Sequence, residues 1–218
     1  MNNLWTTMKR LITYITGLFL LALGATFSIL AGLGVSPVTS LPYALSLITP
    51  YSVGMTTIAA NILFIIIQML LLRTIQWKNF TMQLIITFIF GFFMDATVYM
   101  TSFLPVAHSP ALIALYFALS LVLVALALTF YFTSTLPMMP YDSLTYVIAT
   151  KWTMPFSKAK ITSDVLNVLV ALALCLLFTQ QFGAIGIGTF MAAYAIGKLV
   201  GLCLAWLQPP VKKWIFAT

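Results

Sequence analysis

The chain has 218 residues, of which 62% are hydrophobic and only 6% are charged, and it contains no glutamate. This composition excludes a soluble globular protein, because about 25% of the residues of such a protein are charged and face water. The high aromatic content of 14% excludes intrinsic disorder, and two cysteines are too few for a disulfide-rich secreted domain. The composition therefore predicts an all-α, multi-spanning membrane protein whose main surroundings are a lipid bilayer.

Six apolar segments are long enough to cross a membrane, since a bilayer core of about 30 Å requires about 20 helical residues. The first is preceded by Lys9 and Arg10 and is too long for a cleavable signal peptide, so we expect it to stay in the protein. The six predicted spans are Leu11–Leu33, Val53–Leu72, Phe80–Leu104, Ala111–Thr133, Ile161–Thr179 and Ala184–Leu207.

The basic residues predict the orientation of these spans, because lysine and arginine in short loops are retained on the cytoplasmic side. If the N-terminus is cytoplasmic, nine of the ten basic residues lie in cytoplasmic segments or at helix ends that face them. The three external connectors contain no basic residue, and Lys198 falls within the last span. We therefore expect both termini to be cytoplasmic.

Two further segments, Ser36–Thr49 and Pro140–Trp152, are too short to span a membrane and too apolar for ordinary loops. Both contain the pattern P-x-[TD]-S-L-x-Y, in which the two copies are identical at four of seven positions. A second match follows each copy, where Pro50-Tyr51-Ser52 corresponds to Pro155-Phe156-Ser157. Matches in the same order and at equivalent places predict an internal duplication.

The duplication predicts one polytopic domain over residues 1–218, with repeat 1 at 11–104 and repeat 2 at 111–207. Each repeat contains three spans, and because three is an odd number the second repeat is inverted relative to the first. Inverted repeats with interrupted helices are typical of secondary transporters, whose sites lie near the membrane midplane. Each Pro-initiated segment is expected to be either a short re-entrant helix or an interfacial helix with no role in binding.

Four short motifs suggest a relationship. The runs Gly32–Pro37, Ser52–Thr57, Phe90–Asp95 and Gly186–Phe190 resemble the bacterial YczE-like integral membrane proteins, which are relatives of the YitT group. The resemblance covers nearly the whole chain and implies a protein of the bacterial cytoplasmic membrane. The chain departs from that pattern at Thr39, where the family often has an acidic residue, and at Lys198, where a proline is common.

Ionisable residues within a membrane are costly, about 2.5–3.5 kcal/mol each on insertion scales, so each needs a partner, water or a function. Asp95 and Asp164 are expected intramembrane charges, and Asp164 has an alternative structural role as the partner of Lys160 four residues earlier. Asp142 follows Pro140 and could instead stabilise a helix N-terminus. We expect Lys198 to pair with Asp142 or Asp95 in an interior cavity.

The expected substrate-binding residues lie on the two Pro-initiated segments and the last span. They are Ser36, Thr39, Ser40, Tyr43, Asp142, Ser143, Tyr146 and Lys198. Helix N-termini and Lys198 would attract an anionic group, whereas an aspartate could hold an amine or a coupling proton.

No metal site, cofactor or enzymatic activity is expected. Cys175 and Cys203 each stand alone in apolar surroundings, and His108 has no second ligand nearby. The sequence contains no Walker loop and no HExxH motif. The basic residues are dispersed in small groups, so nucleic-acid binding is not expected either.

The sequence thus favours a small secondary transporter that moves an unknown small polar or charged metabolite by alternating access, and a homodimer is compatible with it. One alternative is the substrate-capture subunit of an energy-coupling-factor transporter, although the Ala-x-x-x-Ala docking motif of that class is missing around Ala22 and Ala25. Another is a non-transporting accessory or regulatory protein, for which a closely packed centre is expected.

Overall fold

The computed structural model describes residues 2–74 and 76–216, and these residues form eight helices and no strand. Six of the helices are long and apolar enough to cross a membrane, and they correspond one by one to the six predicted spans. The helices are α1 (Asn2–Ala31), α2 (Pro37–Ile48), α3 (Val53–Leu72), α4 (Trp77–Thr101), α5 (Pro110–Thr133), α6 (Pro140–Lys151), α7 (Phe156–Thr179) and α8 (Ile187–Phe216). The chain is therefore an all-α, multi-pass membrane protein.

The first and last helices are longer than the apolar segments from which they were predicted. Helix α1 already begins at Asn2, and α8 continues through Pro209 and Pro210 to Phe216. The added turns carry basic residues such as Arg10, which are stable on a helix once it leaves the apolar core of a membrane. The apolar pattern therefore predicted the part of each helix that is long enough to cross a membrane, but not where the helix begins and ends.

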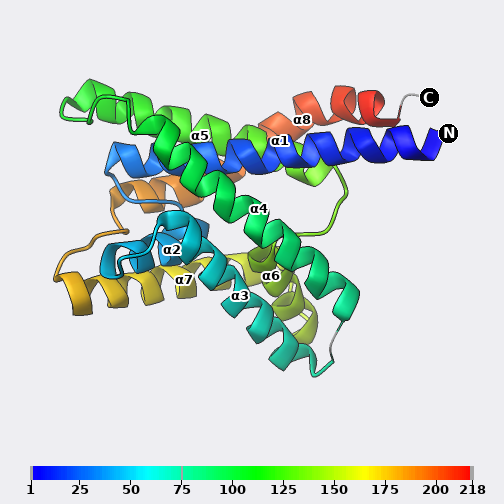
Figure 1. The fold of residues 1–218 in the computed structure, drawn as a ribbon, viewed down its shortest axis with the longest axis horizontal. Coiled ribbons are helices and arrows are strands. Elements are labelled where there is room, and N and C mark those ends of the chain that lie inside the picture. The colour runs from blue at the N-terminus through cyan, green and yellow to red at the C-terminus, as the bar shows by residue number, and fades with distance from the viewer. Residues whose placement is uncertain (1, 75, 217–218) are drawn as a thin grey trace.

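Most helix contacts of one half have a counterpart in the other half. Helix α1 packs against its counterpart α5, and Figure 1 shows the two side by side and running in opposite directions. Helix α4 packs on α1 as α8 packs on α5. Each short helix lies against a long helix of the opposite half, α2 against α7 and α6 against α3. This exchange of contacts is the arrangement expected of two inverted repeats.

A side-chain amide from the opposite half holds the first carbonyl group of each short helix. Asn167 of α7 donates to the Pro37 carbonyl oxygen at 2.6 Å, and Gln68 of α3 donates to the Pro140 carbonyl oxygen at 3.0 Å. Both helices have proline in the first turn, where its missing N–H is not needed for the helix. Proline therefore starts each helix, and an amide from the other half fixes its position.

The two halves differ in one pair of contacts. Helices α3 and α4 pack closely, and a side chain on Gly54 would overlap the Gly91 carbonyl group, so that this approach requires glycine. Helices α7 and α8, the corresponding pair, lie apart (Figure 1) and have no comparable contact in the described part of the chain. On α8, Gly197 and Gly201 face open space. One half is thus closed where the other is open.

An aspartate strengthens the closed pair. The Asp95 carboxylate on α4 accepts hydrogen bonds from the Ser52 hydroxyl and from the Gly54 N–H, both at 2.7 Å. Ser52 is the N-cap of α3 and also accepts from the Met55 N–H. A carboxylate at a helix N-terminus interacts favourably with the helix dipole. Asp95 therefore fastens α4 to the start of α3.

Hydrogen bonds join the loop between α1 and α2 to the loop between α7 and α8. The Val35 N–H donates to the Ala184 carbonyl at 3.0 Å, and the Gly188 N–H donates to the Leu33 carbonyl at 2.7 Å. The GLGVSP and GIGT runs of the sequence therefore meet in space.

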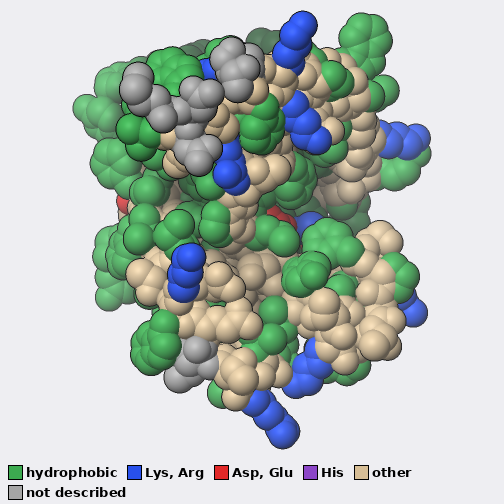
Figure 2. All heavy atoms as spheres, turned by 90° about the vertical axis from the view of Figure 1, so that its right-hand side faces the viewer, with side chains coloured by type: hydrophobic (Ala, Val, Ile, Leu, Met, Phe, Trp, Pro, Cys, Tyr) green, Lys and Arg blue, Asp and Glu red, His purple; other side chains and the backbone are tan. Residues whose placement is uncertain are grey.

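The end of the molecule at which α1 begins and α8 ends is rich in basic side chains. Figure 2 looks onto this end and shows lysine and arginine side chains around it. An acidic and a basic side chain are visible at its centre, in a hollow between the upper and lower parts of the view. Such a concentration of positive charge at one end is typical of a cytoplasmic face.

Candidate functional site

A cavity of about 270 Å³ lies between the two halves. The first turns of α2 and α6 line it, as do the middle parts of α1, α5 and α8. Both short helices therefore begin at the level of the centres of the long helices. Side chains from both halves enclose this cavity, and both Pro-initiated segments contribute to its lining.

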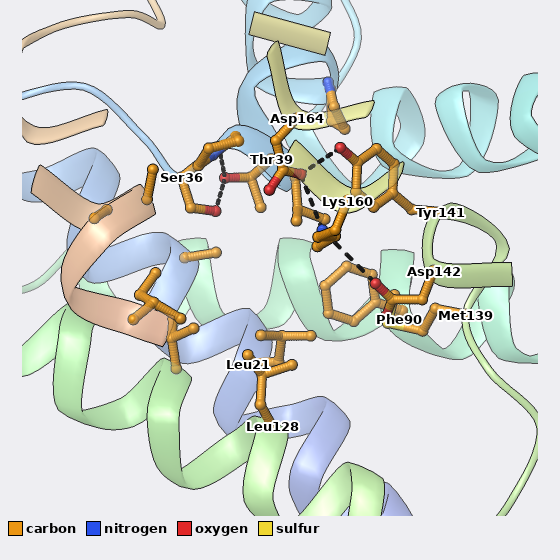
Figure 3. Close-up of a pocket in the computed structure, with 18 of the residues that line it drawn as sticks. Leu21, Ser36, Thr39, Phe90, Leu128, Met139, Tyr141, Asp142, Lys160 and Asp164 are labelled. Carbon is orange, nitrogen blue, oxygen red and sulfur yellow. Dashed lines mark hydrogen bonds and ion pairs between the residues drawn. The ribbon is translucent and has the colours of Figure 1, made fainter. Parts of the chain in front are cut away.

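One wall of the cavity carries three charged side chains in contact (Figure 3). The Lys160 Nζ atom lies 2.9 Å from the Asp164 Oδ1 atom and 3.8 Å from the Asp142 Oδ1 atom. The Tyr141 hydroxyl donates to the same Asp164 oxygen at 2.5 Å. Lys160 also lies over the Tyr141 ring, with Nζ 4.3 Å from the ring centroid. One lysine thus serves two carboxylates.

Local structure explains how these side chains come together. Pro140 begins α6, so Asp142 lies in the first turn, where a negative charge is favourable. Lys160 and Asp164 are four residues apart on α7 and share one face of that helix. The Tyr131 hydroxyl of α5 accepts from the Met139 N–H at 2.7 Å just before α6, which fixes the entry of the chain into this helix.

The two carboxylates and the ammonium group carry a formal charge of −1 when all three are ionised. Their side chains are 16–28% exposed, so water screens them only partly. No other lysine or arginine lines the cavity. The described cavity therefore has an excess of negative charge on one wall.

Hydroxyl groups from α2 form the adjoining part of the wall. Ser36 and Thr39 lie 3.0 Å apart through their hydroxyl oxygens, and the Thr39 hydroxyl also contacts the Ser36 carbonyl. Figure 3 shows this pair beside the charged cluster. These hydroxyl groups hydrogen-bond within the first turn of α2. This part of the cavity wall is therefore polar but uncharged.

Asn61 of α3 is a buried amide that also lines the cavity. The residue is only 5% exposed, and no hydrogen bond joins its side chain to the described residues. Its amide is not among the fully buried atoms without a partner, which are the Thr87 and Ser163 hydroxyls, because it borders the cavity. Asn61 lies one helical turn before Phe64, whose ring packs against Tyr141 with 5.2 Å between centroids. A buried amide without a partner is unusual, because such groups are nearly always hydrogen-bonded.

The opposite walls of the cavity are apolar. Figure 3 shows Leu21 and Leu128 facing the charged cluster across the open space, with Phe90 and Met139 at the side. Ala192, Ile196 and Gly197 of α8 complete this lining. A ligand in the cavity would meet polar groups on one side and hydrocarbon on the other.

The structure brings together some of the predicted site residues and separates others. Ser36, Thr39 and Asp142 line the cavity, and so does Asp164, which also forms the predicted pair with Lys160. The remaining predicted residues do not line it; these are Ser40, Tyr43, Ser143, Tyr146 and Lys198. Ser40 and Ser143 instead have structural partners, since Ser40 donates to the Pro37 carbonyl and Ser143 accepts from Gln83.

The prediction that Lys198 pairs with an aspartate in the interior is wrong. Lys198 is exposed on α8, and its Nζ lies 4.4 Å from the centroid of the Tyr194 ring. Asp95 is also outside the cavity, because it caps α3. The pairing with Asp142 belongs to Lys160, whose ammonium group also lies over the Tyr141 ring.

Sequence reasoning missed the asparagines and Gln68. Asn61 and Asn167 lie on corresponding helices and at nearly the same distance from the matching segments, nine residues after Ser52 and ten residues after Ser157. Extending the repeat by one more helix would have identified both. Polar amides in apolar spans are the signal that was available.

The described residues contain no cluster of three or more histidine, cysteine or acidic side chains that could hold a metal ion. Cys175 is buried and Cys203 is partly exposed, and both are free thiols. The site therefore consists of one lysine, two aspartates, a tyrosine, hydroxyl groups and an amide, which together can bind a small molecule or a proton.

Comparison with known proteins identifies one relative. The chain is 28% identical over 189 residues to the Bacillus subtilis (strain 168) protein described as "Uncharacterized protein YyaS", and the match covers 86% of this chain and 88% of the relative. No solved structure matches the chain. A family model described as "Family of unknown function (DUF6198)" matches residues 8–205, and the chain therefore belongs to this family.

Proposed function

We propose that the protein is a small secondary transporter that moves a small polar or charged metabolite across the bacterial cytoplasmic membrane. The observation that carries this proposal is the central cavity, which both inverted halves line and which lies where both short helices begin. Transporters built from inverted repeats bind their substrates at such a place. The sequence resemblance to YczE-like proteins supports the same bacterial membrane location.

The difference between the two halves supports alternating access. In inverted-repeat transporters, the two repeats exchange conformations when the site changes from one side of the membrane to the other. Here α3 and α4 are closed while α7 and α8 are apart. The second state would bring α7 against the open face of α8 at Gly197 and Gly201, and would part α3 from α4. The hydrogen bond between Val35 and Ala184 would hold the two connectors together while the helices move.

The described state would then be open to the cytoplasm. Figure 2 shows the central hollow from the end that is rich in basic residues, which we propose to be cytoplasmic together with both termini. Single cysteines at Asn79 and Ser109, in a background without Cys175 and Cys203, are expected to react from opposite sides of the membrane. Labelling of both from one side would contradict this topology.

A purely accessory role fits the cavity less well, because a protein without a ligand needs no polar groups around an open centre. The charged cluster of Asp142, Lys160 and Asp164 lies in the cavity, not at the lipid surface. Burial of such groups is costly unless they have a function or very good partners. We therefore propose binding and transport, without a catalytic step.

The test is to prevent the exchange of the two halves. The Ser52 and Asp95 side chains touch at 2.7 Å, so a S52C/D95C pair could form a disulfide that locks α3 to α4. In proteoliposomes, uptake of the substrate found by screening metabolite pools should stop on oxidation and return on reduction. The two single variants are the controls, since they lose the same hydrogen bond but cannot be cross-linked. Unchanged uptake by the oxidised protein would overturn the proposal of alternating access.

A further inference from the structure

We propose that the cavity binds an organic monocation, a protonated amine with a small apolar body. The ammonium group would lie between the Asp142 carboxylate and the Asn61 amide, and the apolar body would lie against α1, α5 and α8. This inference rests on the proposed function only in treating the bound molecule as the transported one. Binding itself requires no transport.

The first argument is charge. Lys160 already contacts Asp164 at 2.9 Å and Asp142 at 3.8 Å, and Tyr141 supplies a further hydrogen bond to Asp164 alone. The Asp142 carboxylate therefore lies farther from the lysine than the Asp164 carboxylate does, and its other polar neighbour is the Tyr131 hydroxyl. A monocation would bring the formal charge of the cluster from −1 to zero, whereas an anion would bring it to −2. Coulomb interactions are stronger in a cavity with largely apolar walls than in bulk water.

The second argument is the unpartnered amide of Asn61. The asparagine of the corresponding helix in the other half, Asn167, has a structural role in holding the Pro37 carbonyl. The corresponding carbonyl of Pro140 is held by Gln68, which leaves Asn61 without that role. An amide that is 95% buried and lines a cavity provides one carbonyl acceptor and two donors for a ligand. Its carbonyl oxygen can accept a hydrogen bond from an ammonium group.

The third argument is the shape of the remaining lining. Leu21, Leu128 and Ile196 offer hydrocarbon on the side opposite the carboxylates. The volume of about 270 Å³ lies just below the range of ligand sites, which is roughly 300–1,000 Å³. The cavity therefore suits a small molecule with one charged end and one apolar end.

Positive charge is not available for an anionic ligand. Lys160 is the one basic side chain among the residues that line the described cavity, and it is already paired with carboxylates. Lys198, which would have favoured an anion, lies outside. The lining thus discriminates between signs of charge, which the sequence left open.

The experiment measures binding to the purified protein with three molecules of similar shape. 2-Phenylethylammonium is the cation, 2-phenylethanol the neutral control and 3-phenylpropionate the anion. We expect the cation to bind at least about tenfold more tightly than either control, which corresponds to about 1.4 kcal/mol. Equal binding of all three, or tighter binding of the anion, would overturn the inference.

Variants locate the binding. Asp142→Asn should weaken binding of the cation about tenfold or more, since it removes the negative charge of the carboxylate that lies farther from Lys160. Asn61→Leu should also weaken binding, and it should fold normally because Asn61 holds no other group. Lys198→Met, outside the cavity, should bind as the parent does. If Asn61→Leu and Asp142→Asn both bind the cation like the parent, the assigned site is wrong.

Uptake into proteoliposomes separates this inference from the proposed function. Binding of the cation without uptake of any cation would contradict transport but leave the site intact. Uptake of neutral or anionic metabolites that stops when the S52C/D95C pair is oxidised would support transport. If the cation did not bind in the same preparation, the inference of a cationic substrate would be overturned.

Discussion

Asn61 and Asn167 provide a matched pair of substitutions with opposite expected effects. The two asparagines are 5% and 6% exposed and lie on corresponding helices of the two halves, α3 and α7. Asn167→Leu removes the 2.6 Å hydrogen bond to the Pro37 carbonyl and leaves that buried oxygen without its donor. A buried acceptor left unsatisfied costs about 1–3 kcal/mol of unfolding free energy. Asn61→Leu removes no hydrogen bond, so stability should be unchanged or higher.

The magnitude allows a simple assay. A change of 1 kcal/mol shifts the midpoint of thermal unfolding by about 2–4 °C in a chain of 150–250 residues. Asn167→Leu should therefore lower the midpoint in detergent by about 4–8 °C if the cost is about 2 kcal/mol. Hydrogen bonds within membranes average somewhat less, about 0.6 kcal/mol in one well-studied protein, which sets the lower limit of the expected effect.

The comparison between the two variants decides the question. Both replace asparagine by leucine in a buried position on corresponding helices, so the change in side-chain volume and apolarity is shared. If both variants lose the same stability, the amide of Asn167 does not hold α2 in place. If Asn61→Leu is the less stable of the two, Asn61 has a structural partner and the binding role assigned to it is wrong.

Three further predictions concern packing, charge and a helix end. Gly54→Ala should lower stability by about 1–3 kcal/mol, because its methyl group would overlap a carbonyl oxygen of α4, whereas Gly201→Ala faces open space and should not; thermal unfolding of both variants checks this. Lys160→Met should destabilise the protein by about 1.5–3 kcal/mol, because it leaves two carboxylates without their lysine partner. Lys198→Met should be neutral or stabilising, and equal losses of stability in the two variants would contradict the pairing of Lys160 with the aspartates. Arg10→Gln should lower the unfolding midpoint through a loss of about 1–2 kcal/mol, since the guanidinium group donates to two carbonyl oxygens at the end of α5, and an unchanged midpoint would show that these hydrogen bonds do not stabilise the fold.

The spans could be predicted because their cause is simple. Lipid offers no hydrogen bonds, so a spanning segment must pair its backbone polar groups within its own helix, and length and apolarity suffice to recognise it. All six predicted spans are confirmed. The short helices were also recognisable, because Pro37 and Pro140 begin them in the same pattern. Their packing against the opposite half depends on tertiary contacts that no local pattern contains.

The charged site could be predicted only in part, for the same reason. The cost of burying a charge indicated that each aspartate needs a partner, but it did not indicate which one. Lys198 was chosen because it lies deep in a span, yet the face of α8 that carries it points outward. Lys160 was assigned to the end of a helix, although its flexible stem reaches the cavity. The rotation of a helix about its axis decides which of its side chains face the cavity. This rotation is set by packing between segments that are distant in the sequence.

The cross-wise anchoring of the short helices affects how the protein can be made. The Pro37 carbonyl accepts from the Asn167 amide, which is synthesised 130 residues later. The Pro140 carbonyl accepts from the Gln68 amide, which is synthesised 72 residues earlier. During insertion, the first half therefore emerges with an incomplete α2, while the second half can dock its α6 at once onto a finished α3. Neither half is a complete folding unit, and co-expression of 1–107 with 108–218 should rescue fragments that are degraded when either is produced alone.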